Sequence, residues 1–598
     1  MTVSPPTTET AAPTTGPAAP TTEPAAGDTR TDKAVARQSA RPDGPALDAP
    51  LDAPLLSVEG LRVRFGGREV VHGISFSARP GRCLAIVGES GSGKSVTART
   101  LVGLTGGDSR VTADRMTLHG LDLTRRSERA WRRIRGKEIG FVLQDALVSL
   151  DQLRKVGDEV AEPLRLHGVG TRASRKARAI ELLASVGVPE PEVKARQRPY
   201  ELSGGLRQRT LIAGAIALDP PLLIADEPTT ALDVTVQAQI LDLLVEAKER
   251  GRAIILISHD LSVVARLADD IAVMKDGEIV EQGPAHEILR NARHPYTQAL
   301  LDAVPSEHTR GRRLVKPAAD DGDAAGSPSV RTRRAVERDR PVIDARHLTK
   351  VYTGPDKIDR TVVDDVSFEL FPGETLGIVG ESGSGKTTTA RIALSLISPT
   401  AGEVLLHGQA WSSLTQAQRR PLRHRIGVVY QDPLSSFDPR WPVGRILTDA
   451  LATGPTPPSS RAEAHGRAVR LLEQVGLREE HFDSAPLRLS GGQRQRVAIA
   501  RALAPEPGVI VCDEPVSALD VSIQAQVLDL LTDLQDELGV SYLFISHDLG
   551  VIHHMSDRIL VMKDGKAVES GTADDVFERP RHDYTRRLLT ALPRISQA

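Results

Sequence analysis

The sequence predicts an α/β protein in which two similar domains follow one another along the chain. Its 598 residues are too many for a single hydrophobic core. A series of motifs occurs twice in the same order: GESGSGKS at residues 88–95 returns as GESGSGKT at residues 380–387, and LSGG at residues 202–205 returns at residues 489–492. In each copy, short apolar segments typical of strands alternate with helix-forming segments. Repetition of this kind predicts two homologous domains.

The two domains are predicted at residues 55–305 and 341–598, and the segments outside them differ in composition. Residues 1–54 are rich in Pro, Thr and Ala, which bury too little apolar surface to offset the entropy of ordering the chain, so we expect a disordered tail. Residues 306–340 combine mixed charges with Gly, Pro and Ser and have no apolar periodicity, which indicates a linker.

Charge and aromatic content argue against a protein that binds nucleic acid. The 76 Lys and Arg residues nearly balance the 78 Asp and Glu residues, and the formal net charge is -2, so no basic field covers the molecule. Aromatic residues make up only 3% of the chain, too few for a surface that stacks bases. We therefore expect no nucleic-acid partner.

The cysteines and the hydropathy of the chain indicate the cellular compartment in which it works. Cys83 and Cys512 lie far apart, each in an apolar stretch, so we expect buried thiols rather than a disulfide framework, a four-thiolate metal site or an iron–sulfur site. No apolar run approaches the ~18 to 20 residues that cross a bilayer, and the N-terminal sequence lacks the features of a secretory signal. These observations predict a cytoplasmic chain.

Each domain contains the pattern GxxxxGK[ST] between an apolar strand and a helix-forming segment. Glycines let successive backbone N–H groups turn inward, and the helix N-terminus adds a partial positive charge, which together form a site for a polyphosphate. We expect Lys94 and Lys386 to reach the β and γ phosphates, and Ser95 and Thr387 to offer hydroxyls to Mg²⁺. The predicted phosphate-binding residues are Gly88, Glu89, Ser90, Gly91, Ser92, Gly93, Lys94, Ser95 and Val96, and Gly380, Glu381, Ser382, Gly383, Ser384, Gly385, Lys386, Thr387 and Thr388.

A second acidic element follows in each copy, in LLIADEP at residues 222–228 and VIVCDEP at residues 509–515. Each is an apolar strand that ends in two acids. Asp226 and Asp513 at the C-terminal end of these strands would hold Mg²⁺ beside the phosphates. Glu227 and Glu514 would orient and deprotonate the attacking water.

With these motifs, the sequence resembles the ATP-binding cassette family over both halves. LSGG followed by RQR, upstream of a strand ending in DEP, is the discriminating feature. The resemblance implies two cassettes, each with a RecA-like core, an antiparallel β-subdomain and a helical subdomain. It also implies head-to-tail packing as an intramolecular dimer, with each ATP between the phosphate loop of one copy and LSGG of the other. The signature residues are Ser490, Gly491 and Gly492 for the first site and Ser203, Gly204 and Gly205 for the second.

The resemblance also assigns roles to residues outside the phosphate loops. His259 and His547, each in ISHDL, resemble the switch histidine that contacts the γ phosphate. Gln144 and Gln431 follow apolar strands and resemble the residue that senses Mg²⁺, so the predicted metal ligands are Ser95, Gln144 and Asp226 in one copy and Thr387, Gln431 and Asp513 in the other. ALD at residues 231–233 and 518–520 is similar to the loop that crosses the dimer interface.

Two further positions qualify this prediction. Phe65 and Tyr352 occupy the corresponding early strand of each copy, where the family stacks a ring on adenine; ordinary packing is the alternative. The first signature reads LSGGLRQR and the second LSGGQRQR, so Leu206 replaces a polar residue and the second site is expected to differ in detail. Because both copies retain the Lys, Glu and His needed for hydrolysis, we predict two competent sites.

Segments beside the motifs resemble the dipeptide, oligopeptide and nickel importer ATPases. One pair of such segments follows Gln144 and Gln431. The other pair lies at the domain ends, HPYTQALLDAVP at residues 294–305 and HDYTRRLLTALP at residues 582–593. For the domain ends, an ordinary amphipathic helix is the alternative. The resemblance implies hydrolysis of MgATP at the cytoplasmic face of the membrane. Its implied partners are two integral-membrane permease subunits and an extracytoplasmic solute-binding protein. The cysteine cluster of some members is absent.

Three alternatives stay open at this stage. A tandem cassette ATPase acting on the ribosome would carry a long helical connector, whereas residues 306–340 contain several Pro and Gly. A DNA-repair ATPase of this type would need cysteine-rich zinc modules that two cysteines do not supply. An exporter would use the same ATP chemistry. Dipeptide, oligopeptide, nickel, glutathione-like and sugar-like solutes all remain open.

Overall fold

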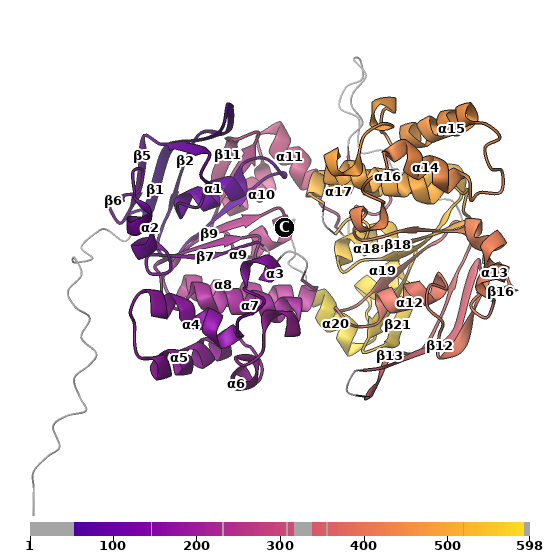
Figure 1. Ribbon diagram of the computed structural model, residues 1–598, viewed down its shortest axis with the longest axis horizontal. Helices are drawn as coiled ribbons and strands as arrows, with labels where there is room; N and C mark the ends of the chain where they lie inside the picture. Colours follow the sequence, from indigo (N-terminus) through magenta and orange to yellow (C-terminus); the bar gives the residue numbers. More distant parts are fainter. Residues whose placement is uncertain are drawn as a thin grey trace, which may run out of the picture. The chain divides into compact units, whose positions relative to one another are not determined.

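The computed structural model describes residues 53–144, 146–229, 232–306, 309–315, 336, 338–354, 357–517 and 519–590 (Figure 1). These residues belong to one compact unit that begins at Asp52. The predicted tail, apart from residues 53 and 54, lies outside the described residues, and so does most of the predicted linker. We refer to residues 55–305 as the first repeat and to residues 341–598 as the second.

Each repeat is centred on a six-stranded, mainly parallel sheet. The order in the first repeat is β11(Glu278–Pro284), β10(Asp270–Lys275), β3(Cys83–Val87), β9(Ala253–Ser258), β8(Leu222–Asp226) and β7(Ile139–Val142). The order in the second is β21(Lys566–Thr572), β20(Arg558–Lys563), β14(Thr375–Val379), β19(Ser541–Ile545), β18(Val509–Asp513) and β17(Ile426–Val429). Only the β10–β11 and β20–β21 pairs are antiparallel. The central strands are continuous apolar runs because other elements cover both faces of each sheet.

A second, antiparallel sheet adjoins each core. In the first repeat it contains β2(Arg68–Ala78), β1(Leu56–Phe65), β5(Arg115–Leu118) and β6(Leu121–Asp122), with β4(Ser109–Thr112) paired to β1. In the second repeat it contains β13(Asp359–Leu370), β12(Ile343–Thr353), β15(Ala401–Leu406) and β16(Gln409–Ala410). The family's antiparallel β-subdomain is thus present in both copies.

The helices are also duplicated. Those of the first repeat are α1(Lys94–Leu101), α2(Glu128–Ile134), α3(Ala146–Ser149), α4(Val156–Leu166), α5(Arg172–Ser185), α6(Pro191–Lys194), the 3₁₀ turn η1(Pro199–Glu201), α7(Gly204–Ala215), α8(Val234–Glu249), α9(Leu261–Leu267), α10(Ala285–Asn291) and α11(Pro295–Asp302). Helices α4, α5 and α7 contact one another and form the helical subdomain (Figure 1).

The second repeat follows the same plan. Its helices are α12(Lys386–Ala393), α13(Gln416–Arg419), η2(Arg420–Arg425), η3(Leu434–Ser436), α14(Val443–Leu451), α15(Arg461–Gln474), η4(Glu479–His481), η5(Pro486–Arg488), α16(Gly491–Leu503), α17(Val521–Leu538), α18(Leu549–Met555), α19(Ala573–Glu578) and α20(Asp583–Thr590). Helices α14, α15 and α16 form the equivalent helical subdomain (Figure 1). The predicted α/β fold with two tandem copies is confirmed.

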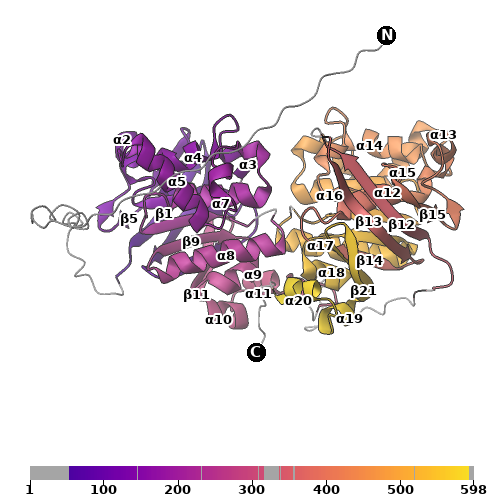
Figure 2. The same cartoon turned by 90° about the horizontal axis from the view of Figure 1, so that it is seen from below.

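Apolar cores lie on both faces of the six-stranded sheets. One face packs against the antiparallel sheet and α1 or α12. The other packs against the long helix α8 or α17, and α8 lies beside the sheet in both views (Figures 1 and 2). Cys83 and Cys512 are free and fully buried here, as predicted, and burial raises the pKa of both thiols. Within the described residues, we find no helix with the length and apolar character of a membrane span.

Candidate functional site

The GxxxxGK[ST] motif forms a tight loop between β3 and α1, and again between β14 and α12. Glycine is required where the loop leaves the strand. Gly88 has φ of +149°, and a Cβ there would lie 2.1 Å from the backbone oxygen of Met274. Gly93 and Gly385, with φ of 101° and 97°, precede the helices that begin at Lys94 and Lys386. The predicted strand, loop and helix are therefore all present in both copies.

The lysine of each loop is buried and points back to the start of its own loop. Lys94 Nζ donates to the backbone oxygens of Gly88 and Glu89, both at 2.7 Å. Lys386 Nζ repeats these contacts with the first two residues of the second loop, at 2.7 and 2.8 Å. Burial lowers the pKa of both lysines, against the pull of nearby carboxylates. Each ammonium group has three N–H donors, so it can bind phosphate oxygens while it keeps the bond to the first carbonyl of its loop.

The predicted metal ligands of the two strands meet the loops. Ser95 Oγ donates to Asp226 Oδ1 at 3.0 Å, and Thr387 Oγ1 donates to Asp513 Oδ1 at 3.2 Å. Asp226 is fully buried, and its second oxygen, Oδ2, has no hydrogen-bond partner among the described residues. Burial raises the pKa of both aspartates. A buried carboxylate oxygen beside a hydroxyl fits a hard divalent cation such as Mg²⁺.

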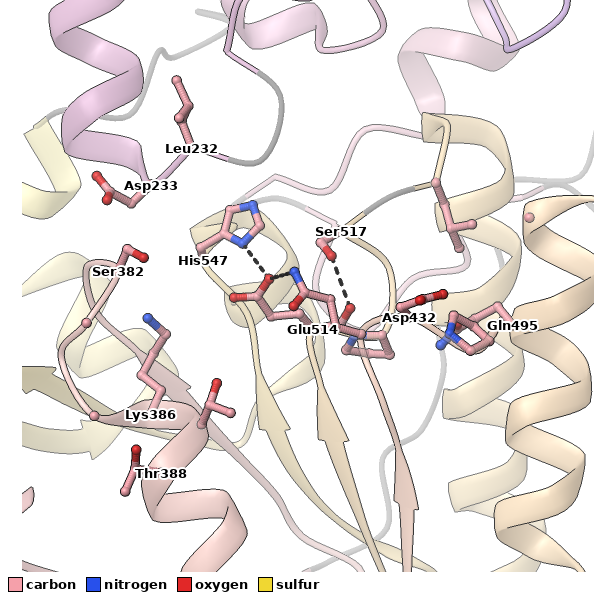
Figure 3. Close-up of a pocket in the computed structure, with 18 of the residues that line it drawn as sticks. Leu232, Asp233, Ser382, Lys386, Thr388, Asp432, Gln495, Glu514, Ser517 and His547 are labelled. Atoms are coloured by element: carbon pink, nitrogen blue, oxygen red, sulfur yellow. Dashed lines mark hydrogen bonds and ion pairs between the residues drawn. The ribbon is translucent and has the colours of Figure 1, made fainter. Parts of the chain in front are cut away.

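The glutamate after each strand is held between a glutamine and a histidine. Gln144 Nε2 donates to Glu227 Oε2 at 2.8 Å, and His259 Nδ1 lies 3.2 Å from Oε1 of the same carboxylate. Gln431, Glu514 and His547 repeat the arrangement at 2.8 and 3.2 Å (Figure 3). Both glutamates have positive φ, 48° and 51°, a strained conformation for a residue with a side chain. The structure thus brings together three residue types that are widely separated in sequence.

Electrostatics favour the charged forms of Glu514 and His547. Burial opposes ionisation of Glu514, but the hydrogen bond and charge of His547 outweigh it and lower the pKa of the carboxyl. Burial likewise opposes protonation of His547, and the bond to Glu514 outweighs it, so the pKa of the imidazole is raised. The pKa of His259 is raised for the same reason by Glu227. An ionised glutamate is the form that can accept a proton from water.

A cavity of about 700 Å³ surrounds the second phosphate loop (Figure 3). Its lining includes the residues predicted for the second site, Ser382, Gly383, Gly385, Lys386, Thr387, Thr388, Gln431, Glu514 and His547, together with Leu232 and Asp233 of the first repeat. Gly491, predicted at the first site, also lines this cavity. Ser203, Gly204 and Gly205 are not among the described residues that line it. Their place at this site stays a prediction, as does that of Ser490, Gly491 and Gly492 at the first site.

Contacts cross between the repeats at both loops. Asp520 Oδ1 accepts hydrogen bonds from the backbone N–H and the hydroxyl of Ser90, both at 2.8 Å. Thr235 Oγ1 donates to Glu381 Oε1 at 2.6 Å. Asp520 belongs to the predicted interface loop, whereas Thr235 lies on α8, two residues after the equivalent loop. Leu232 and Asp233 of that equivalent loop line the cavity at the second phosphate loop, so each repeat reaches the phosphate loop of the other, which supports head-to-tail packing. Ala231 and Ala518 of the two loops lie outside the described residues.

The signature glycines have a structural role in addition to the predicted one. Ser203 and Ser490 cap the N-termini of α7 and α16. A Cβ at Gly205 would lie 2.6 Å from Val236 Cγ1, and one at Gly492 would lie 2.4 Å from Ile523 Cγ2. The second glycine is therefore required for the signature helix to pack on the next long helix.

The aromatic residues predicted at adenine lie in the expected strands. Phe65 ends β1 and is partly buried against the core of the antiparallel sheet. Tyr352 on β12 is 42% exposed, and Lys350 Nζ lies 5.1 Å from the centre of its ring. Neither lines the cavity. Adenine stacking stays a prediction for both.

The sequence reasoning missed two tyrosines. Tyr296 and Tyr584 each accept a hydrogen bond from the backbone of a phosphate loop. The signal was present, because both tyrosines stand at the same position of the repeated HPYT and HDYT motif.

Known proteins and family models match most of this chain. The ABC transporter family model matches residues 71–230 and 363–517, and the model of the oligopeptide/dipeptide transporter C-terminal region matches residues 280–327 and 568–598. The oligopeptide transport ATP-binding protein OppD of Mycobacterium tuberculosis is 43% identical, over 90% of this chain and 98% of its own length. The glutathione import ATP-binding protein GsiA of Salmonella typhimurium is 43% identical, over 90% and 89%. The solved structure of a dimeric bacterial ABC transporter cassette is 31% identical and covers 39% of this chain and 98% of its own, with a TM-score of 0.37.

Over these matches, the chain belongs to the ABC transporter family. Both of its repeats carry the C-terminal region of the oligopeptide/dipeptide transporters. The chain is accordingly an ATP-hydrolysing transport subunit with two fused cassettes, which supports the transporter prediction over the ribosomal alternative.

Proposed function

We propose that this chain hydrolyses MgATP at the cytoplasmic face of a membrane and drives the import of peptides or a related small solute. Its partners would be two integral-membrane permease subunits and an extracytoplasmic solute-binding protein. The main support is that both curated relatives are ATP-binding proteins of uptake or transport systems and match about nine-tenths of the chain. Oligopeptides and glutathione, which the names of these relatives specify, share a peptide backbone with a free carboxylate, so we propose a short peptide as the solute.

The proposed chemistry is in-line transfer of the γ phosphoryl group to water. Mg²⁺, held by Asp226 and Ser95 or by Asp513 and Thr387, would neutralise charge on the β and γ phosphates. Lys94 and Lys386 would keep the bond to the first carbonyl of their loops and donate their remaining N–H groups to phosphate oxygens. Positioning and charge neutralisation are most of what a protein contributes to phosphoryl transfer.

The glutamates would then act on water. Glu514 is ionised and oriented by Gln431 at 2.8 Å and His547 at 3.2 Å, so its carboxylate can align a water and accept its proton. Glu227 would do the same at the first site. The equal distances in the two repeats support two competent sites.

We also propose that ATP closes the pair of cassettes. Serine hydroxyls and glycine N–H groups at the starts of α7 and α16 would bind the γ phosphate of the opposite site. ATP would then favour the closed state because it binds that state more tightly than the open one. Phosphate release would reopen the pair. The contacts of Asp520 and Thr235 with the opposite loops link each site to the other repeat.

Co-purification from native membranes tests the proposed partners. The bait is the tagged Glu227→Gln/Glu514→Gln chain, which should retain ATP in the closed state, and its control is Lys94→Ala/Lys386→Ala. Mass spectrometry should find two polytopic permeases with the first bait under MgATP. Uptake of labelled dipeptides, longer peptides and glutathione would then be compared between cells that have the gene and cells that lack it. The solute is the compound whose uptake is lost with the gene. Ribosomal proteins in place of permeases, or outward transport, would overturn the proposal.

A further inference from the structure

Two tyrosines outside the known nucleotide-binding motifs contact the phosphate loops. Tyr296 lies in the first turn of α11, and its phenol oxygen accepts a hydrogen bond from the backbone N–H of Glu89 at 3.1 Å. Tyr584 lies in the first turn of α20 and accepts from the backbone N–H of Glu381 at 3.0 Å. The two contacts occupy the same position in HPYT and HDYT, so the same device occurs in both repeats.

The peptide group that each tyrosine holds is the one that also holds the lysine. The Glu89 N–H and the Gly88 carbonyl belong to one planar peptide group. Its N–H donates to Tyr296, and its oxygen accepts from Lys94 Nζ at 2.7 Å. A rigid peptide that is fixed on one side is fixed on the other, so the phenol orients the carbonyl that positions the ammonium group.

The second repeat has the same geometry. The N–H of the peptide between Gly380 and Glu381 donates to Tyr584, and its oxygen accepts from Lys386 Nζ at 2.7 Å. The same contact therefore recurs at equivalent positions of both repeats.

Each tyrosine is itself held in place by its motif. His294 Nδ1 accepts from the backbone N–H of Tyr296 at 3.2 Å, and the N–H groups of Arg293 and His294 donate to Glu281 at 2.7 and 3.2 Å. Lys275 Nζ lies 5.0 Å from the centre of the tyrosine ring, within the range of a cation–π contact. The ring is therefore anchored at its backbone and on its face.

These supports are repeated around Tyr584. His582 Nδ1 accepts its backbone N–H at 3.1 Å, Glu569 accepts the N–H groups of Arg581 and His582 at 2.7 and 3.1 Å, and Lys563 Nζ lies 5.2 Å from the ring centre. The histidine, the tyrosine and the preceding acid thus act together to place one hydroxyl group.

We propose that Tyr296 and Tyr584 are positioning residues of the two ATP sites: each fixes the first peptide of its phosphate loop and, through it, the phosphate-binding lysine. The C-terminal region of each cassette would then be part of the nucleotide site. This inference rests on ATP binding at the two loops and is independent of the identity of the solute.

The protonation state of the phenols agrees with this role. Burial raises the pKa of both tyrosines to about 12. The oxygen therefore accepts the N–H bond as a neutral hydroxyl at physiological pH, and no negative charge is placed beside the phosphates.

The test is the full-length Tyr296→Phe/Tyr584→Phe variant. It removes the two phenol oxygens and keeps both rings beside Lys275 and Lys563. The loop N–H groups lose a bond of the kind that contributes about 0.5–1.5 kcal/mol, so we expect KM for MgATP and Kd for MgADP to rise about two- to tenfold. We expect kcat to change less than twofold, because the loop contacts nucleotide in both the ground and the transition state.

Tyr542→Phe is the matched control. Tyr542 is fully buried, and its hydroxyl donates to the backbone oxygen of Leu531 at 2.9 Å, away from both loops. It should lower the thermal unfolding temperature and leave KM unchanged. A double variant with wild-type KM and Kd would overturn the inference, and so would one whose effect is confined to the unfolding temperature. Titration of the wild-type chain with MgADP tests nucleotide binding itself. If the proposed function fails, the wild-type chain does not bind MgADP; if only the tyrosine inference fails, wild type and double variant bind it equally.

Discussion

The side-chain amide of Gln431 donates a 2.8 Å hydrogen bond to Glu514, on the carboxylate oxygen that His547 also contacts at 3.2 Å. Glu514 directly follows β18, and Gln431 lies two positions after the end of β17, so the two residues are joined across adjacent strands. His547 follows β19, the next strand of the sheet. Three neighbouring parallel strands deliver one side chain each to the same edge of the sheet. This is the edge at which ligands bind in open α/β sheets.

Glu227→Gln/Glu514→Gln should abolish most hydrolysis and leave ATP binding intact. An amide can keep the contact with the neighbouring glutamine or histidine, but it does not accept a proton from water. Loss of a general base costs about 10²- to 10⁴-fold in rate. Phosphate release measures the rate, and equilibrium binding of MgATP measures the affinity.

Glu249→Gln is the control for that variant, because Glu249 is exposed at the C-terminal end of α8. It should hydrolyse ATP at the wild-type rate. Normal turnover by the double variant would remove the glutamates from the catalytic role. The two single variants would then show whether the two sites contribute equally.

The pairing of His547 with Glu514 makes stability depend on pH in a defined window. The pKa of His547 is raised above 6.5, so its contribution is complete below pH 6.5 and is lost as the pH rises through the folded-state value. The pKa of Glu514 is lowered below 4.5, so its contribution is complete above pH 4.5 and is lost as the pH falls through the folded-state value. The pair stabilises most between these limits.

His547→Gln measures this contribution. The difference in thermal unfolding temperature between wild type and variant should be larger at pH 6 than at pH 8.5, because the contribution of the imidazole is complete below pH 6.5 and declines as the pH rises through its raised pKa. His286→Gln is the control, since His286 is exposed on α10 and has no equivalent glutamate. A difference that is constant from pH 6 to pH 8.5 would contradict the assigned ion pair.

The sequence predicted the two copies, the strands and the loops because each depends on local pattern. Apolar runs ending in GxxxxGK or DEP define strand ends, and parallel strand ends meet at one edge, so Lys386, Asp513 and Glu514 could be placed without coordinates. Tyr584 could not be placed in this way, because its contact with Glu381 spans 203 positions and depends on tertiary packing. Likewise, the glycine motif did not reveal that Gly205 is needed beside Val236.

Leu206→Gln should stabilise the N-terminus of α7. In the second repeat, Gln493 Oε1 accepts from the backbone N–H of Ser490 at 2.9 Å, and Ser490 Oγ accepts from the N–H of Gln493 at 3.2 Å, a reciprocal capping box. In the first repeat, only Ser203 can take part, with a contact of 3.4 Å from Leu206 N–H. A leucine has no oxygen to complete the pair.

The gain expected from Leu206→Gln is about 0.5–1 kcal/mol, the usual contribution of a cap. Amide hydrogen exchange at Ser203 should slow several-fold in the variant. The reverse change, Gln493→Leu, is the matched control and should speed exchange at Ser490. Unchanged exchange in both variants would show that the box does not stabilise these helices.

A segment after the first repeat is anchored on the second. The backbone N–H groups of Leu314 and Val315 donate to Asp529 at 3.2 and 2.9 Å, and Asp529 is only 4% exposed. The repeat-equivalent residue in the same LDLL sequence, Asp242, is exposed and pairs with Arg266. Arg313 adds an ion pair with Asp533 on the same helix, α17.

Asp529→Ala should therefore release this segment, whereas Asp242→Ala should not. One buried and one partly buried N–H donor would lose their acceptor, at a cost of about 1–3 kcal/mol, which corresponds to roughly a 5- to 150-fold faster amide exchange at Leu314 and Val315. Asp242 lies on the surface, where a substitution changes stability by about 0.5 kcal/mol or less. Hydrogen exchange with mass spectrometry of a peptide spanning residues 309–315 measures both. Equal exchange in the two variants would mean that the carboxylate of Asp529 does not hold the segment, and that its position depends on Leu314, which is 4% exposed, and on the ion pair of Arg313.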